Sequence, residues 1–197
     1  VFCHALAEVI RRIAARATPL QMKRFVDSAR AYFSALLWEA SNRVAHRIPP
    51  LVEYRRMRRL SGAVPTTFDL IDVVGGFELG AEDRARPDLR TLYWSAVDIT
   101  CWSNDILSYA KELQRGGDFH NLPSVLQQEH RCSIQEAMAI ASQMHDDEVR
   151  HFIEVERQVL ESDGSTELRR YVAGLRSWIQ GNYRWSLETA RYLTQSN

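Results

Sequence analysis

Apolar residues recur at intervals of three and four along nearly the whole chain, and this spacing is the feature that most constrains its fold. Phe25, Ala29, Phe33, Leu36 and Leu37 form one such series. An α-helix, with about 3.6 residues per turn, places residues at this spacing on a single face. No segment of the sequence shows the sustained alternation that is typical of a half-buried strand. The sequence therefore predicts an all-α protein.

Prolines and glycines divide this pattern into several helices, some of them long. Pro49-Pro50 and Ser61-Gly62 are the clearest boundaries. Ser133 and Glu136 have the spacing of a capping box, and Asp118 is the expected cap of the short helix near Pro123. The expected helices cover residues 2–16, 19–46, 51–60, 63–75, 88–114, 121–129, 133–162 and 166–194.

Composition narrows the cellular setting and the kinds of partner. The 197 residues are 45% hydrophobic, enough for one domain with a core over residues 1–197. A formal net charge of zero predicts neither nucleic acid nor an anionic membrane as the partner. There is no apolar run of membrane-spanning length, and three cysteines without zinc-type spacing favour a reducing compartment. We therefore expect a cytoplasmic protein that holds any anion through local side chains.

The stretch NDILSYAKE repeats an oxygen-bearing side chain every four residues, at Asn104, Ser108 and Glu112. Each step of four turns a side chain by only about 40° around the helix, so all three lie on one face. An amide oxygen, a hydroxyl and one carboxylate suit Mg²⁺, which completes its coordination with water or phosphate oxygens. Lys111 stands beside them and could bind phosphate. The same three residues are also compatible with a solvated stripe of hydrogen-bonded neighbours.

Two other segments carry side chains suited to a phosphorylated, apolar ligand. Arg58 precedes Ser61-Gly62, which weakens a helix at a point where a ligand could enter. Trp178 and Trp185 are seven residues apart and share a helix face, although aromatic residues at this spacing are more often part of a core. The pair Arg191-Tyr192 follows them.

Together these residues resemble the catalytic domain of bacterial class I terpene synthases, over about residues 53–192. Asn104, Asp105, Ile106, Ser108 and Glu112 fit every place of that family's second metal motif. In the family, the residue at the Asp105 position is normally not a ligand. The resemblance thus implies the helical bundle of class I terpenoid synthases and a magnesium ion at this motif.

The resemblance also implies a role for the other candidate residues. Arg58 would sense diphosphate, with Ser61 as the linker and Gly62 as the effector of that response. Lys111 would bind diphosphate as well. Arg191 and Tyr192 would grip diphosphate as the site closes. The residues that would line the hydrocarbon pocket are Thr100, Cys101, Trp178, Asn182 and Trp185.

One feature of the family is not found where it is expected. Its aspartate-rich motif, which binds the other two of three magnesium ions, lies well over a hundred residues before the second motif. Only 103 residues precede Asn104. The segment HDDEVRH contains Asp146-Asp147, but it follows the second motif and has Arg150 in the fifth place. We therefore expect that the amino-terminal helices with this motif lie outside the chain, and that the chain alone is inactive.

The implied activity is the magnesium-dependent ionisation of a linear prenyl diphosphate, followed by cyclisation of the carbocation. Farnesyl diphosphate, giving a sesquiterpene, is the first expectation for the substrate, and geranyl diphosphate is the alternative. A prenyltransferase would be expected to show two aspartate-rich motifs, and neither is visible in the sequence. A non-catalytic helical interaction module derived from this family is the other alternative. Antiparallel dimers are common in similar proteins, so a homodimer fits as well.

Two further charged groups are interpreted as solvated surface. They are Arg55, Arg56 and Arg59 on the helix of Arg58, and the acidic run 146–148.

Overall fold

The computed structural model describes residues 2–114, 119–162 and 165–189. Within these residues every regular element is an α-helix, which confirms the all-α prediction. The helices are α1 (Phe2–Ala14), α2 (Pro19–Val44), α3 (Leu51–Ser61), α4 (Val64–Phe68), α5 (Ile71–Gly75), α6 (Ala81–Ala85), α7 (Pro87–Gln114), α8 (Leu122–His130), α9 (Ile134–Glu161) and α10 (Thr166–Glu188).

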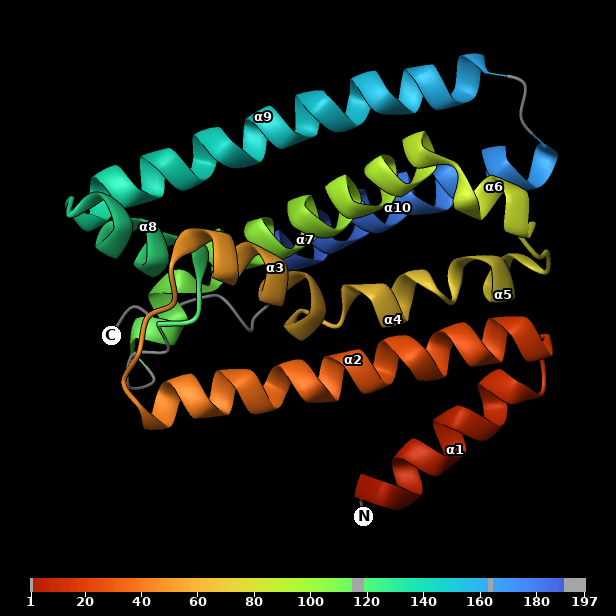
Figure 1. Ribbon diagram of the computed structural model, residues 1–197, viewed down its shortest axis with the longest axis horizontal. Helices are drawn as coiled ribbons and strands as arrows, with labels where there is room; N and C mark the ends of the chain where they lie inside the picture. The colour runs from red at the N-terminus through yellow and green to blue at the C-terminus, as the bar shows by residue number, and fades with distance from the viewer. Residues whose placement is uncertain (1, 115–118, 163–164, 190–197) are drawn as a thin grey trace.

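Helix α7 is the centre of the bundle (Figure 1). It packs against α9 and α10 along much of its length, and α3, α4, α6 and α8 also contact it. Its buried side chains include Leu92, Val97 and Trp102, which lie in one hydrophobic cluster with residues of α8, α9 and α10. A helix covered on several sides needs apolar residues around most of its circumference. The candidate metal motif therefore sits on a helix that is packed against other helices on several sides.

The expected helix over 63–75 is instead two short helices, α4 and α5, and α6 was not predicted. The turn between α4 and α5 is tight because the Leu70 amide donates to the Thr67 carbonyl, three residues back. A turn of this kind leaves the apolar spacing almost unchanged, so periodicity does not reveal it. Helix α6 has only five residues, which is too short for a periodic pattern to be recognised.

The helix ends follow the expected capping chemistry with one exception. Ser133 and Glu136 form the predicted capping box at the start of α9. Asp118 lies outside the described residues, and Asn121 is the residue that caps α8, accepting a hydrogen bond from the Ser124 amide. Helix α10 ends at Glu188. The last residues of the expected helix 166–194, from residue 190 onward, lie outside the described residues.

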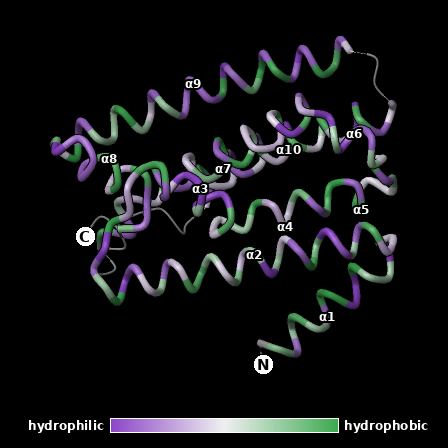
Figure 2. The backbone as a smooth tube through the Cα atoms, viewed as in Figure 1, coloured by the Kyte–Doolittle hydropathy of each residue, from purple (hydrophilic) through white to green (hydrophobic). Residues whose placement is uncertain are grey.

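Apolar residues are not confined to the core. Figure 2 shows hydrophobic and hydrophilic segments following one another along the long helices. On α2, Leu37 and Val44 are 71% and 83% exposed, so apolar spacing marks the buried face of this helix only in part. No helix in the described part of the chain combines the length and the hydropathy needed to cross a membrane.

Candidate metal centre

The three predicted magnesium ligands lie in one column on α7. Ser108 is buried, whereas Asn104 and Glu112 are half-buried. The Ser108 hydroxyl donates to Glu112 Oε1 over 2.5 Å, so these two side chains meet as the spacing predicts. Among the described residues there is no cluster of three or more His, Cys, Asp or Glu side chains that could hold a metal. Any cation at this site would rest on one carboxylate and two neutral oxygens, which is a set of hard ligands that fits Mg²⁺.

Arg58 reaches this column from α3. Its Nη2 donates to Asn104 Oδ1 over 3.0 Å, and its Nε and Nη2 donate to Asp105 Oδ1 over 2.9 and 2.7 Å. The side chain is only 13% exposed. Although burial opposes the charge, the neighbouring Asp105 carboxylate keeps the pKa of Arg58 well above its usual value. A permanent cation therefore stands at the edge of the candidate metal site.

Asp105 faces away from the column, toward α3 and α8. Besides Arg58, its carboxylate accepts hydrogen bonds from the Tyr54 hydroxyl and, over 3.1 Å, from the Leu122 amide. Burial raises the pKa of Asp105, and the charge and hydrogen bonds of Arg58 counter part of that shift. The carboxylate thus joins three helices and orients the arginine, and the expectation that Asp105 is not a metal ligand stays a prediction.

Glu112 is held at both carboxylate oxygens. Ser108 binds Oε1, and Asn121 Nδ2 donates to Oε2 over 3.2 Å. Burial raises the pKa of Glu112, and the hydrogen bonds from Ser108 and Asn121 oppose the rise. Sequence reasoning missed Asn121, because no helical spacing relates it to the motif. The only sequence signal was its place two residues before Pro123, which is typical of a helix cap.

The break after α3 lies where Ser61-Gly62 predicts it. Gly62 has φ of −71°, which any residue adopts, so the glycine is not needed for backbone conformation. A Cβ atom there would lie 2.6 Å from Cys101 Sγ and 3.1 Å from the Arg58 carbonyl oxygen. The glycine allows α3 to approach α7 closely. Cys101 is buried beneath it, and burial raises the pKa of its thiol to about 12.

Replacing Gly62 with alanine is therefore expected to destabilise the fold by about 1–3 kcal/mol, because Cys101 and α3 must move apart. Gly181→Ala is the matched control. Gly181 lies inside α10 with no atom within 4 Å of an added Cβ, so alanine there should stabilise the helix by about 0.5–1 kcal/mol. Urea unfolding of both variants measures the difference. Equal effects at the two positions would contradict the close-approach explanation.

The remaining candidate residues lie in different surroundings. Ser61 is buried, and its hydroxyl has no hydrogen-bond partner among the described residues. Lys111 is half-buried on α7, one position before Glu112 and hence about 100° from it around the helix. Arg191 and Tyr192 lie outside the described residues.

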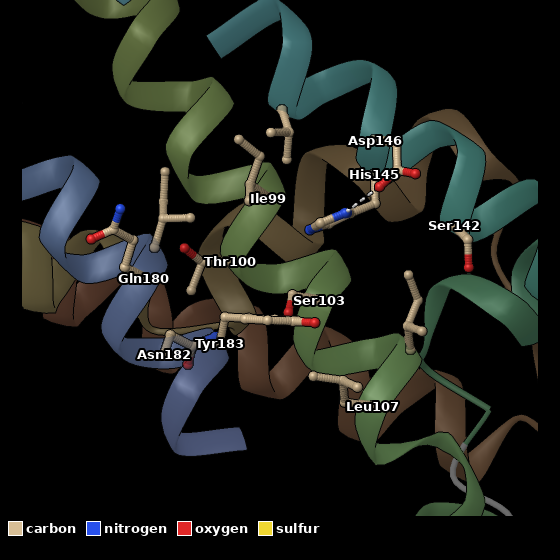
Figure 3. Close-up of a pocket in the computed structure, with 13 residues that line it drawn as sticks. Ile99, Thr100, Ser103, Leu107, Ser142, His145, Asp146, Gln180, Asn182 and Tyr183 are labelled. Atoms are coloured by element: carbon tan, nitrogen blue, oxygen red, sulfur yellow. Dashed lines mark hydrogen bonds and ion pairs between the residues drawn. The ribbon is translucent and has the colours of Figure 1, made fainter. Parts of the chain in front are cut away.

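The candidate hydrocarbon-binding residues are divided between two cavities. One, of about 510 Å³, is lined by Trp178, Asn182 and Trp185 of α10. The other, of about 400 Å³, lies between α7, α9 and α10 and includes Thr100 and Asn182 (Figure 3). Asn182 belongs to both, and one of its donors, Nδ2, is buried without a partner in the described structure. Cys101 packs under Gly62 instead.

The expectation of a solvated face was wrong for Arg59, whereas the Arg55 side chain is 41% exposed and agrees with it in part. Arg59 Nε and Nη2 bind the two oxygens of Asp98 over 2.8 and 2.7 Å, and Arg55 Nη2 lies 3.6 Å from the same carboxylate. Asp98 is almost fully buried, so its charge requires these partners. Arg56 is exposed, as expected. Within the acidic run, Asp146 and Asp147 are exposed as predicted, although Asp146 also lies at the edge of the second cavity.

Comparison with known proteins assigns the family. The sequence model described as terpene synthase family 2, C-terminal metal binding, matches residues 1–151. The chain belongs to this terpene synthase family. The matched region includes the whole of α7 and the break at Gly62, and it ends within α9.

Two curated relatives and one solved structure show the extent of the similarity. The (+)-T-muurolol synthase of Roseiflexus castenholzii, named as cyclising (2E,6E)-farnesyl diphosphate, is 41% identical, covering 96% of this chain and 58% of that protein. The 4-epi-cubebol synthase of Streptosporangium roseum, named for the same substrate, is 39% identical, covering 98% and 58%. The 2-methylisoborneol synthase of Streptomyces coelicolor A3(2), solved with Mg²⁺ and 2-fluorogeranyl diphosphate, has a TM-score of 0.85 at 28% identity, covering 92% and 58%. The chain thus spans a little over half the length of each.

Proposed function

We propose that this chain supplies one wall of a class I terpene cyclase, in which Asn104, Ser108 and Glu112 hold a magnesium ion beside a prenyl diphosphate. The observation that carries the proposal is the contact between Arg58 Nη2 and Asn104 Oδ1. The sequence suggested an anion-binding arginine and a cation-binding column separately. Arg58 and Asn104 lie 46 residues apart along the chain, in different helices. In the fold they adjoin, as recognition of a metal–diphosphate pair requires.

The charges around the column favour a polyanionic ligand. Asp105 and Arg58 compensate each other, which leaves Glu112 as the carboxylate of this motif that would face the cation. A dication bound there would keep a net positive charge, to which Lys111 adds. Arg58 uses Nε and Nη2 for its contacts in the described structure, so its Nη1 group is left to donate to an oxygen of the ligand. Diphosphate offers oxygens to all of these groups.

Departure of the diphosphate is the first step that these residues would promote. When bound, Mg²⁺ supplies Lewis-acid stabilisation of the negative charge that develops on the leaving group. Arg58 and Lys111 add fixed positive charge, and Asp105 holds the arginine in place, so little reorganisation is needed during ionisation. We further propose that Ser61 and Gly62 respond to the ligand at the helix break, and that Arg191 and Tyr192 bind the diphosphate as the site closes.

The second step is cyclisation of the carbocation in an apolar pocket. Trp178 and Trp185 line the same cavity on α10. Each aromatic face can stabilise a passing cation by about 1–2 kcal/mol when water is excluded. Phe68 is buried and lies 6.1 Å from Trp178 between ring centroids, so it packs against one of these two rings from the core. Thr100 and Asn182 are proposed to complete the pocket from α7 and α10, and Cys101 to contribute from beneath Gly62.

Farnesyl diphosphate is the proposed substrate and a sesquiterpene the product, because both curated relatives are named for cyclising farnesyl diphosphate. Geranyl diphosphate is the second candidate, since the structural neighbour is bound to 2-fluorogeranyl diphosphate. We also propose three magnesium ions in the working enzyme, one of them at this chain's motif. The chain is proposed to form part of a single catalytic domain that associates as a homodimer. A cytoplasmic site of action is supported by three free cysteines.

The direct test is to incubate the gene product, as the cell makes it, with Mg²⁺ and either farnesyl or geranyl diphosphate, and to analyse the extracted hydrocarbons by gas chromatography and mass spectrometry. A cyclic fifteen-carbon product supports the proposal. Release of a linear alcohol alone, at the rate seen without protein, would overturn it.

Ligand binding should also appear as stabilisation of the 197-residue chain. Inorganic diphosphate with Mg²⁺ at about 100 times its dissociation constant should raise the free energy of unfolding by about 2.7 kcal/mol and the melting temperature by about 5–10 °C. Diphosphate with a chelator, and Mg²⁺ without diphosphate, serve as controls and should give much smaller shifts, because one carboxylate holds Mg²⁺ weakly. Identical melting curves in all three conditions would contradict a combined metal and diphosphate site.

A further inference from the structure

The cap of α8, Asn121, and its first residue, Leu122, contact the two carboxylates of the metal motif. Asn121 and Leu122 are almost completely buried at this junction. The Leu122 amide donates to Asp105 Oδ2 over 3.1 Å, and Asn121 Nδ2 donates to Glu112 Oε2 over 3.2 Å. The start of α8 is thus attached to α7 at the point where the candidate magnesium ion would bind.

Asn121 uses different halves of its amide for contacts with α8 and with Glu112. Its Oδ1 accepts from the Ser124 amide over 3.0 Å and so caps α8, while its Nδ2 donates to Glu112. A side-chain amide is suited to this because it carries both an acceptor and a donor. Serine or aspartate would cap the helix equally well but would offer no N–H to the glutamate. The residue type therefore fits a second purpose beyond capping.

The contact from Asn121 complements the one from Ser108. Ser108 Oγ lies 2.5 Å from Oε1 of Glu112, and Asn121 Nδ2 lies 3.2 Å from Oε2. One donor on each oxygen fixes both the rotamer and the plane of the carboxylate. Each oxygen retains a further lone pair for a cation. Without Asn121, the carboxylate could rotate about its terminal bond and would lose one of its two hydrogen bonds.

We propose that Asn121 is a positioning residue for the magnesium site, which acts by holding Glu112 in the orientation that binds the cation. This inference rests on the proposed function, because it assumes that Glu112 is a metal ligand. Groups that orient a metal ligand usually contribute 10–100-fold to metal affinity. The same contact joins α8 to the metal site, so the position of α8 and the affinity for the cation depend on each other.

The test uses Asn121→Ser in the full chain, since serine keeps the helix cap and lacks the amide N–H that donates to Glu112. Mg²⁺ is titrated by calorimetry at a fixed concentration of inorganic diphosphate, and melting temperatures are measured without metal. We expect Asn121→Ser to weaken Mg²⁺ binding by about 10–100-fold, with a melting temperature within about 4 °C of the unmodified chain.

Ser133→Ala is the matched control, because it removes a helix cap at α9, far from the metal motif in sequence and on the exposed surface. It should lower the melting temperature by about 2–4 °C and leave Mg²⁺ binding unchanged. Unchanged binding in Asn121→Ser, while Glu112→Gln loses it, would overturn the inference and leave the proposed function standing. Equal weakening by Ser133→Ala would also overturn it, by showing a general effect of lower stability. Absence of Mg²⁺–diphosphate binding in the unmodified chain would overturn both.

Discussion

Replacing Glu112 with glutamine is expected to lower turnover by more than about 100-fold while leaving the fold nearly intact. The substitution removes the one carboxylate of the column, whereas residues that only orient a metal ligand already contribute 10–100-fold. Glutamine has nearly the same helix propensity and can still accept the hydrogen bond from Ser108. The measurement is the rate of diphosphate release from farnesyl diphosphate at several Mg²⁺ concentrations, together with a melting curve.

Glu161→Gln provides the matched control for this variant. Glu161 is an exposed residue of α9 that pairs with Arg157 one helical turn away. The change from carboxylate to amide is the same, but an exposed pair of this kind contributes only about 0.3–0.5 kcal/mol. The Glu161→Gln variant should have the same activity as the unmodified protein. Equal activity of Glu112→Gln and the unmodified protein at limiting Mg²⁺ would contradict the assignment of Glu112 as a metal ligand.

Replacing Arg58 with alanine should strongly destabilise the fold. Removing one partner of a buried ion pair leaves Asp105 charged and poorly compensated, which typically costs about 3–5 kcal/mol. For a chain of this size, that corresponds to a fall of about 10 °C or more in melting temperature. The measurement is urea or thermal unfolding without metal or diphosphate.

Arg56→Ala is the control here, since Arg56 lies on the same helix but is exposed. It should change the free energy of unfolding by no more than about 0.5 kcal/mol. Arg58→Lys separates charge from geometry: lysine keeps the charge but cannot place two donors on Asp105 and a third contact on Asn104. We expect its stability between that of alanine and arginine, with weaker diphosphate binding. A lysine variant that binds diphosphate normally would show that Arg58 acts in folding alone.

This double involvement of Arg58 changes how its predicted role is understood. The resemblance implied that the Arg58 side chain senses diphosphate. In the structure this side chain already donates hydrogen bonds to Asp105 and Asn104. We expect an arginine held in this way to move little when the ligand arrives. Its contribution to ionisation would come from fixed charge beside the leaving group, which is the more effective arrangement for stabilising a transition state.

The site was predictable from the sequence only where its residues are close along the chain. The column on α7 follows from one helical period, and the contact between Ser108 and Glu112 confirms the shared face. The nearness of Arg58 to Asn104 was implied by family resemblance and not by spacing. Asn121 had no such signal, because its contact with Glu112 depends on how the chain returns after α7 to begin α8.

Helical class, most helix positions and the oxygen-bearing face of α7 were determined by the sequence itself, because backbone hydrogen bonds and apolar periodicity are local and repeat every few residues. Tertiary structure decided which charges are buried. Arg59, which was expected on a solvated face, forms an ion pair with the buried Asp98. Asp105 on α7 orients Arg58 on α3. A buried carboxylate must find a partner wherever the packed helices bring one. That partner lies tens of residues away along the chain, at a distance over which no local pattern carries information.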